Sequence, residues 1–221
     1  DPSGSLALRQ ALVAYLAMAR GINCQTEQVI ITNGYAGALG LICLAMAFRG
    51  SQAWVEEPGY LLACQVAGLM GVEPVAVAVD EQGMQISDGM ARAPEASFAL
   101  VTAGQQAPLG ITLSLARRRE LLAWAEQHER WIIEDDYLGE LQLGSRAAPA
   151  LASLDNHGRV IHIGTFSKTL SPALRLGFVV VPPSLVVRFA NLAAAMLPAS
   201  SFVLQNAVAE FLREGHFLRH L

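Results

Sequence analysis

One lysine stands where its amine could do chemistry. Lys168 lies within "HIGTFSKTLSPALRLGFVVVP" (162–182), directly after an apolar run that is typical of a buried strand. A lysine amine forms a Schiff base with a carbonyl compound once desolvation or nearby cations make its proton easy to lose. Arg175, seven residues further along, carries a planar guanidinium that matches a phosphate group. The pair predicts a site that receives a carbonyl group and an anion together.

Further polar groups follow other apolar runs. Asp135, Asp136 and Tyr137 come after "RWIIE", and a glycine-bearing turn at 34–37 comes after "QVIIT". In an open parallel sheet, ligands bind beyond the carboxyl ends of the strands. We therefore expect these groups to lie at one edge of a sheet with Lys168. The other residues expected at this edge are Tyr35, Ala36, Tyr60, Gln106, Thr165, Ser167 and Arg175.

Strand-like and helix-like segments alternate along the chain. "LALRQALVAYLAMAR" (6–20) repeats apolar residues at helical spacing before Gly21, whereas "QVIIT" is short and rich in β-branched residues. Apolar runs separated by helices favour a mainly parallel sheet between two helical layers. The sequence thus predicts an α/β fold of three layers, α/β/α. The expected strands cover 28–32, 53–57, 74–80, 97–103, 130–136, 159–166 and 177–182, and the expected helices cover 6–20, 33–48, 61–70, 114–130, 184–196 and 201–218.

Composition limits the classes of function. The chain has 221 residues, 53% of them apolar and 15% charged, so it is long enough for one large domain. A net charge of -4 without a basic run argues against direct binding to DNA or to an anionic membrane. No apolar stretch reaches the roughly 18 residues that span a bilayer, and "DPSGSLALRQ" lacks a signal-peptide pattern. Cys24, Cys43 and Cys64 have no C-x-x-C spacing and indicate free thiols in a reducing cytoplasm.

Pyridoxal 5'-phosphate accounts for the whole set of polar groups. Its aldehyde needs a lysine amine, and its ring nitrogen needs an ionised carboxylate that keeps it protonated. Its phosphate needs helix N-terminal amides, hydroxyls and a guanidinium, while its ring needs a donor at the phenolic oxygen and an aromatic neighbour. We assign no metal ligands. The candidates in that order are Lys168; Asp135; Tyr35, Ala36, Thr165, Ser167 and Arg175; Tyr137; and Tyr60, with Gln106 as a further cofactor contact.

The motifs resemble those of a known superfamily. "ITNGYAGAL", "EEPGY", "EDDYLGEL" and "TFSKTLSPALRLG" follow one another along nearly the whole chain, as in the large domain of fold-type I pyridoxal-phosphate enzymes, the aspartate aminotransferase superfamily. Through "PLGITLSLARRRELLAWA" and "IGTFSKTLSPALRLG" the chain is most similar to the aminotransferase-like effector domain of MocR-type regulators of the GntR family. This resemblance implies that Lys168 carries the cofactor as an internal aldimine. It also implies that Asp135 binds the ring nitrogen, that Tyr137 donates to O3', and that Arg175 with Thr165 holds the phosphate.

Several points of the resemblance stay open. Asp136 competes with Asp135, although the related pattern places the aspartate two residues before the tyrosine and so favours Asp135. Ala107 stands where aminotransferases carry an asparagine that binds O3', and MocR-type domains also lack that asparagine. Relatives continue into a small C-terminal domain, and MocR proteins begin with a winged-helix DNA-binding domain. We therefore expect residues 1–221 to be one large domain within a longer protein.

Each assignment also has a simpler alternative. Taken alone, Lys168 would be a solvated loop residue and "EDDY" would be a surface turn. Tyr60 could be ordinary packing, Arg175 could pair with a carboxylate, and Ser167 could be only a strand-end hydroxyl. His162 alternates within a strand and is expected to be a core histidine with a partner. It is the joint presence of these groups that favours the cofactor.

Three functions of different class follow. The first is a sensing domain that binds pyridoxal phosphate and an amine or amino acid, with DNA bound only through a domain outside this chain. The second is a class I/II aminotransferase, in which Lys168 also moves a proton as general acid and base. The third is a structural module without cofactor, which is weakest because every cofactor partner but one is present. The superfamily resemblance further implies a homodimer with the cofactor at the subunit interface.

Overall fold

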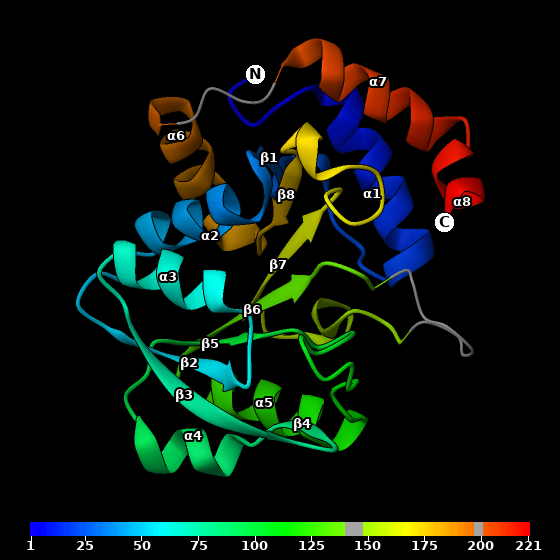
Figure 1. Cartoon of the computed structure of the whole chain (residues 1–221). Helices are drawn as coiled ribbons and strands as arrows, with labels where there is room; N and C mark the ends of the chain where they lie inside the picture. Colours follow the sequence, from blue (N-terminus) through cyan, green and yellow to red (C-terminus); the bar gives the residue numbers. More distant parts are fainter. Residues whose placement is uncertain (140–147, 197–200) are drawn as a thin grey trace.

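The chain is built around one mixed sheet. A computed structural model describes residues 1–139, 148–196 and 201–221, and these contain an eight-stranded sheet in the order β1-β8-β7-β6-β5-β2-β3-β4. Figure 1 shows the strands crossing the centre of the molecule between helices. The strands are β1 (Val29–Thr32), β2 (Gln52–Glu57), β3 (Glu73–Asp80), β4 (Gly83–Met84), β5 (Phe98–Val101), β6 (Trp131–Asp136), β7 (Val160–Thr165) and β8 (Gly177–Val180).

Strand directions decide which loops meet. The strands β7, β6, β5, β2 and β3 are parallel neighbours, whereas β8 is antiparallel to both β1 and β7, and β4 is antiparallel to β3. Thr32 and Thr165, the last residues of β1 and β7, both pair with Gly177, the first residue of β8. The segments that follow β1 and β7 and the segment that precedes β8 therefore converge at one edge of the sheet.

Helices cover both faces of the sheet. Helices α2, α3 and α6 pack on one face, and α1, α4, α5, α7 and α8 pack on the other. Strand side chains alternate between the two layers, so that Ile133 of β6 faces the first and Ile132 faces the second. This arrangement confirms the predicted three-layer α/β/α fold. The helices are α1 (Leu6–Arg20), α2 (Gly34–Ala45), α3 (Leu61–Leu69), α4 (Ile86–Arg92), α5 (Leu115–Gln127), α6 (Val186–Met196), α7 (Phe202–Arg213) and α8 (His216–His220), with short 3-10 turns η1 (Thr26–Gln28), η2 (Leu151–Leu154), η3 (Pro172–Leu174) and η4 (Pro183–Leu185).

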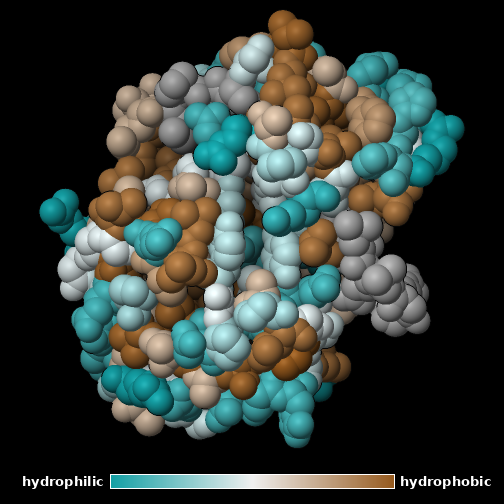
Figure 2. Space-filling model, in the orientation of Figure 1, coloured by the Kyte–Doolittle hydropathy of each residue, from teal (hydrophilic) through white to brown (hydrophobic). Residues whose placement is uncertain are grey.

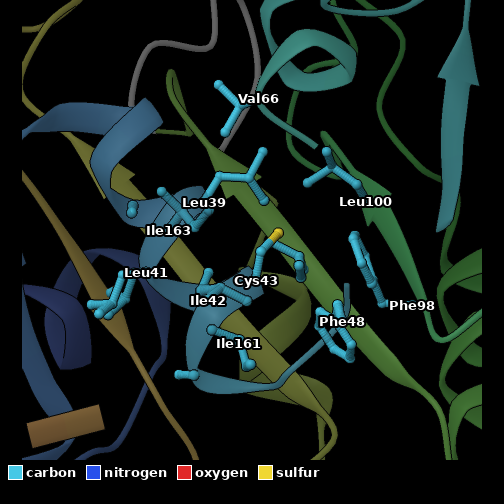
Figure 3. Close-up of a cluster of buried hydrophobic side chains, with 14 of the residues drawn as sticks. Leu39, Leu41, Ile42, Cys43, Phe48, Val66, Phe98, Leu100, Ile161 and Ile163 are labelled. Atoms are coloured by element: carbon cyan, nitrogen blue, oxygen red, sulfur yellow. The ribbon is translucent and has the colours of Figure 1, made fainter. Parts of the chain in front are cut away.

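The buried cluster around α2 fixes the edge of the sheet where the loops meet. Leu39, Ile42 and Cys43 of α2 pack with Ile161 and Ile163 of β7 (Figure 3). The helix is apolar on nearly all sides because the sheet, α3 and α6 surround it. Full burial of one such side chain contributes about 1.5–3 kcal/mol. The cluster therefore holds α2, and with it the first turn of α2, against the ends of β1 and β7.

Local signals set several element boundaries. Gly21 ends α1 in a left-handed conformation with φ 72°, and the Ser114 hydroxyl caps α5 by accepting a hydrogen bond from the Arg117 backbone N–H. Strand β4 and helix α4 are not among the predicted elements. Helix α4 is short and contains Gly89, and its place depends on a distant contact, because the Asp88 carboxylate accepts a hydrogen bond from the Ala78 backbone N–H of β3.

Two further observations concern the cysteines and the helices. Cys24, Cys43 and Cys64 are free thiols, as their spacing predicts. Among residues 1–139, 148–196 and 201–221, every helix is too short or too polar to cross a membrane.

Candidate functional site

A cleft of about 500 Å³ opens at the edge of the sheet where β1, β6 and β7 end. Nine of the ten residues that the sequence predicts to bind a cofactor line this cleft. They come from loops that are far apart in the chain, and the strand directions bring them together. The nine residues are Tyr35, Ala36, Tyr60, Asp135, Tyr137, Thr165, Ser167, Lys168 and Arg175.

Lys168 lies in a tight turn directly after β7. The backbone N–H groups of Leu170 and Ser171 donate to the Phe166 carbonyl at 2.9 and 3.1 Å, and the Phe166 N–H donates to the Leu176 carbonyl at 3.1 Å. These bonds tie the turn to the segment that precedes β8. The Lys168 side chain is exposed and takes part in no ion pair within the described chain. Its amine is therefore available to a ligand in the cleft.

One end of the cleft suits an anion. Tyr35 and Ala36 lie in the first turn of α2, where backbone N–H groups have no acceptor within the helix and carry the positive end of its dipole. The hydroxyl oxygens of Thr165 and Ser167 lie 3.0 Å apart beside it. Arg175 adds an exposed guanidinium without an ion-pair partner among the described residues. Amides, hydroxyls and a guanidinium are the groups that bind phosphate in proteins.

The chain approaches itself closely at this end. A Cβ atom on Gly177 would come within 3.1 Å of the Gly34 Cα atom, and a Cβ atom on Gly34 would lie 3.9 Å from the Arg175 carbonyl carbon. Glycine at position 177 therefore lets the start of β8 pack against the start of α2. Arg175 itself has φ 48° and ψ 37°, a left-handed conformation that is uncommon outside glycine and is frequent at binding sites.

The other end of the cleft holds a buried carboxyl group. Asp135 of β6 is 4% exposed, and its Oδ1 atom has no hydrogen-bond partner in the described part of the chain. Burial, followed by the negative charges of Asp136, Glu56 and Glu134, raises the pKa of Asp135 well above its usual range. A cationic donor bound at this point would reverse that effect and keep Asp135 ionised.

The neighbouring carboxyl group faces away from the cleft. Asp136 forms an ion pair with Arg20, whose Nε atom lies 2.7 Å from Oδ2, and both side chains are buried. Because strand side chains alternate, Asp135 and Asp136 point to opposite faces of the sheet. Asp135 and Asp136 are the two candidates for binding the ring nitrogen, and Asp135 is the one that lines the cleft.

Three tyrosines line the walls between the two ends. The rings of Tyr35 and Tyr60 meet edge to face with centroids 5.7 Å apart, and Tyr60 is 46% exposed at the rim. Burial and then the charge of Asp135 raise the pKa values of Tyr35 and Tyr137 above the usual range. Both hydroxyl groups therefore stay protonated at neutral pH and can donate hydrogen bonds.

Gln106 is the predicted cofactor contact that the structure keeps out of the cleft. Its Nε2 atom donates to the carbonyls of Pro58 and Ala107 at 2.7 and 2.8 Å, and its Oε1 atom accepts from the Leu109 backbone N–H at 3.0 Å. Gln106 thus links the loops that follow β2 and β5, and Ala107 lines the cleft in its place. Its position after a strand was visible in the sequence, but the direction of its side chain was not.

Six residues that line the cleft are not among the ten predicted ones. Asn33, Gly34, Ala107 and Pro172 lie within or directly beside the sequence motifs, so nearness in sequence was the available signal. Leu62 and Thr102 belong to no motif. Leu62 lies in the first turn of α3, and Thr102 directly follows β5. Their presence depends on how α3 and β5 pack, which the local sequence does not encode.

Known proteins are similar to this chain along most or nearly all of its length. The model of the family "Aminotransferase class I and II" matches residues 1–220. The probable rhizopine catabolism regulatory protein MocR of Rhizobium meliloti is 39% identical over 99% of this chain and 44% of its own length. The HTH-type transcriptional regulator TauR of Rhodobacter capsulatus is 37% identical over 95% of this chain and 43% of its own length. The chain spans a little under half the length of these curated relatives.

Solved structures share the fold. A kynurenine aminotransferase of Pyrococcus horikoshii, crystallised with PMP, superposes with a TM-score of 0.88 at 27% identity, covering 99% of this chain and 56% of that one. The α-aminoadipate aminotransferase LysN of Thermus thermophilus, which was crystallised with N-(5'-phosphopyridoxyl)-L-leucine, superposes with a TM-score of 0.86 at 28% identity over the same shares. Both the matching sequence model and the shared fold cover almost all of the chain. The chain therefore belongs to the aminotransferase class I and II family.

Proposed function

We propose that this chain binds pyridoxal 5'-phosphate through Lys168 and serves as the aminotransferase-like sensing domain of a MocR/GntR-type transcriptional regulator. The observation that carries the cofactor part is the unpartnered Oδ1 atom of Asp135, which is buried in the same cleft as the exposed amine of Lys168. A protonated pyridine nitrogen is a cation and a hydrogen-bond donor, which is what this carboxyl group lacks. The residues of the cleft thus fit the cofactor that the family implies.

The opposite end of the cleft supports the phosphate part of the proposal. The backbone amides of Tyr35 and Ala36 would bind phosphate oxygens at the start of α2, together with the hydroxyls of Thr165 and Ser167 and the guanidinium of Arg175. Each hydrogen bond to a charged group contributes about 1.5–3 kcal/mol. This set would place the phosphate by α2 and direct the ring toward Asp135.

The remaining residues would orient the ring and move protons. When bound, pyridoxal phosphate supplies an electron sink that acidifies the Cα–H of an attached amino compound. Asp135 would hold the ring nitrogen protonated, Tyr137 would donate a hydrogen bond to O3', and Tyr60 would contact the ring. Lys168 would hold the cofactor through Nζ and, once released by an incoming amine, would be free to accept or return a proton at that atom.

A Schiff base to a lysine within these 221 residues can form at one position only, because Lys168 is their only lysine. The full-length protein would be mixed with pyridoxal phosphate, reduced with borohydride and mapped by peptide mass spectrometry. We expect a near-visible absorption band and one label, on the peptide that contains Lys168. Lys168→Arg keeps the positive charge and should lose both signals. Equal labelling of wild type and Lys168→Arg within this domain would contradict the assignment.

Two observations support a regulator over an enzyme. The two curated relatives named above, MocR and TauR, are regulators by name, and both match nearly the whole of this chain. In addition, Ala107 lines the cleft, and its methyl group cannot donate the hydrogen bond that an asparagine gives the cofactor in the superfamily's aminotransferases. The small-molecule partner would be an amine or amino acid, and DNA would be bound through another domain.

Measurements on one protein sample distinguish the two functions. Fluorescence anisotropy with the protein's own promoter DNA would be recorded for a panel of amines and amino acids, alongside amino-group transfer to an α-keto acid. We expect an amine-dependent change in DNA affinity that Lys168→Arg abolishes, without sustained transfer. Sustained turnover by a protein that does not bind DNA would support the aminotransferase instead.

We further propose that the protein forms a homodimer, as the resemblance implies. Leu61 is 69% exposed beside Tyr60 at the rim of the cleft, and Phe202 and Val203 of α7 are 49% and 80% exposed. Brown, apolar surface lies at the top of Figure 2, where Figure 1 places α7. Sedimentation velocity should report a dimer for wild type, and a monomer at all protein concentrations would contradict the proposal.

A further inference from the structure

One buried carboxyl group has no part in the assignments above. Glu56 lies near the end of β2 and is 7% exposed, although its neighbour Glu57 is exposed. Its Oε2 atom accepts hydrogen bonds from the Thr102 hydroxyl and, at 3.3 Å, from the Thr102 backbone N–H. Burying an ionised acid without a cationic partner costs free energy, so the position of this acid calls for an explanation.

Glu56 and Asp135 share a small cavity behind the cleft. The cavity has a volume of about 20 Å³, and its walls include Tyr35, Tyr60 and Thr102, which also line the cleft. Two buried polar atoms on its walls, the Tyr35 hydroxyl oxygen and Asp135 Oδ1, have no hydrogen-bond partner in the described part of the chain. A polar cavity of roughly 10–15 Å³ or more with two to four polar partners holds one water molecule.

We propose that this cavity binds one water molecule that links Glu56 to Asp135, and that Glu56 acts in its neutral form as a positioning residue for Asp135. The inference rests on the proposed cofactor site. The protonated oxygen of Glu56 and the Tyr35 hydroxyl would donate to the water, and the water would donate to Asp135 Oδ1. An ionised carboxylate can accept about four hydrogen bonds, so the water would occupy one acceptor site of Oδ1 while the carboxylate still accepts from the ring nitrogen on the cleft side.

Electrostatics decide which of the two acids carries the proton. Two carboxylates that line one cavity repel each other strongly when no cation lies between them. The titratable groups that line the cavity with Glu56 are Tyr35 from α2, Tyr60 directly before α3, Cys64 from α3 and Asp135 from β6, and Tyr137 also responds to the charge of Glu56. No cation lines the cavity among the described residues. Because a cationic ring partner requires an ionised Asp135, the proton belongs on Glu56. Burial raises the pKa of Glu56 to about 7, although hydrogen bonds from Thr102 and from the Gln106 side chain oppose that rise.

A pair of matched variants tests the protonation state without any cofactor. Glu56→Gln is an isosteric change that removes the ionisable group, and Glu57→Gln makes the same change on the exposed neighbour. Between pH 4.5 and about 7, the unfolded chain has released the Glu56 proton while the folded chain keeps it. This proton lowers the folding equilibrium constant by up to tenfold for each rise of one pH unit in that window.

Urea denaturation across this pH range is the measurement. Wild type and Glu57→Gln should share the full loss of stability with rising pH, and Glu56→Gln should show a slope that is smaller by one proton. Equal slopes in all three proteins would overturn the claim that folded Glu56 is protonated. Because the charge of Glu56 contributes to the raised pKa of Asp135, the comparison is repeated in an Asp135→Asn background, where the difference in slope should persist.

Cofactor binding and crystallography test the link to Asp135. Glu56→Gln should bind pyridoxal phosphate as wild type does at pH 6 and should not share a loss of affinity above pH 7. Glu56→Leu should bind roughly tenfold more weakly, the equivalent of one hydrogen bond.

A high-resolution structure of the full chain should show a water bonded to Tyr35 and Asp135. A cavity closed by side chains, or Glu56→Gln binding as weakly as Asp135→Asn, would overturn the inference. Absence of cofactor binding in wild type would contradict the proposed function instead, while the urea measurement would still test Glu56.

Discussion

Strand β6 presents buried carboxyl groups to both faces of the sheet, and the two faces treat them differently. On the face covered by α1 and α5, Glu134 accepts hydrogen bonds from the backbone N–H groups of Leu151 and Ala152 at 2.6 and 3.0 Å. Its Oε2 atom also lies 3.0 Å from Nδ1 of His162. On the face covered by α2, the Oδ1 atom of Asp135 has no partner among the described residues. We call the first the partnered face of β6 and the second the unpartnered face.

The partnered face has a structural role. Arg20 donates from Nε to Asp136 and from Nη1 to the carbonyls of Gly139 and Ala148, at 2.8 and 3.1 Å. One buried guanidinium thus holds the chain on both sides of the segment that follows Tyr137. The expectation that His162 is a core histidine with a partner agrees with this network. A buried acid that already has its partners supports the fold, whereas a buried acid that lacks one is a candidate for binding a water or a ligand.

Removing a charge from the partnered face should produce the largest effect on stability. Asp136→Asn leaves the Arg20 guanidinium buried without its carboxylate. Breaking a buried ion pair by removing one partner costs about 3–5 kcal/mol, so we expect a loss of that size in urea denaturation of the cofactor-free protein. A loss below about 1 kcal/mol, the range of an exposed pair, would show that the pair is not structural.

The corresponding substitution of Asp135 should have the opposite effects: little loss of stability, but a large loss of cofactor affinity. Asp135→Asn removes a buried acid that has no cationic partner, so the cofactor-free protein should be as stable as wild type or more stable. Pyridoxal phosphate affinity should fall by roughly 30-fold or more, since losing one side of a buried charged pair costs about 2–5 kcal/mol. Equilibrium titration of the absorption band measures this. Unchanged affinity would remove Asp135 from the site.

The pair of His162 and Glu134 should produce a smaller, pH-dependent effect. Burial alone lowers the pKa of His162, but the hydrogen bond and charge of Glu134 raise it above its ordinary 6.5. The stabilisation is therefore complete below pH 6.5 and is lost as pH rises through the higher folded value. His162→Gln should remove this decline and cost about 1–3 kcal/mol at pH 6. Parallel stability curves for the two proteins above pH 6.5 would contradict the assignment.

A substitution far from β6 should give the smallest effect. The Ser114 hydroxyl caps α5, so Ser114→Ala should cost about 1 kcal/mol of stability and leave cofactor affinity unchanged. Thermal and cofactor titrations of the same sample check both values. A fall in affinity comparable to that of Asp135→Asn would mean that general destabilisation, and not the unpartnered face, controls binding.

Much of the fold was predictable because its signals are local. Helix α1 repeats its apolar residues at helical spacing and ends at Gly21, and Ser114 marks the start of α5. The strand runs are apolar on both faces because helices cover both sides. Helix α4 escaped prediction because its position depends on Asp88 bonding to another strand, a contact that no local pattern encodes.

The residues of the site also divide into those whose place the local sequence indicates and those whose place depends on distant contacts. That Lys168, Asp135 and Arg175 line one cleft could be predicted from their residue types, their order and their places after or before strands. Glu56 could not, because its burial depends on Thr102, which lies 46 residues away in the sequence. Gln106, expected as a cofactor contact, is not among the residues that line the cleft, since loop–loop bonds determine where its side chain points.

The central claim is that the unpartnered face of β6 receives the ring of pyridoxal phosphate while Lys168 holds its other side. A crystal structure of the full chain grown with the cofactor tests this most directly. We expect continuous density from Lys168 Nζ to the cofactor, and a ring nitrogen about 2.7–2.9 Å from an Asp135 carboxylate oxygen. Density for the ring elsewhere, or a ring nitrogen directed at a group other than Asp135, would contradict the account.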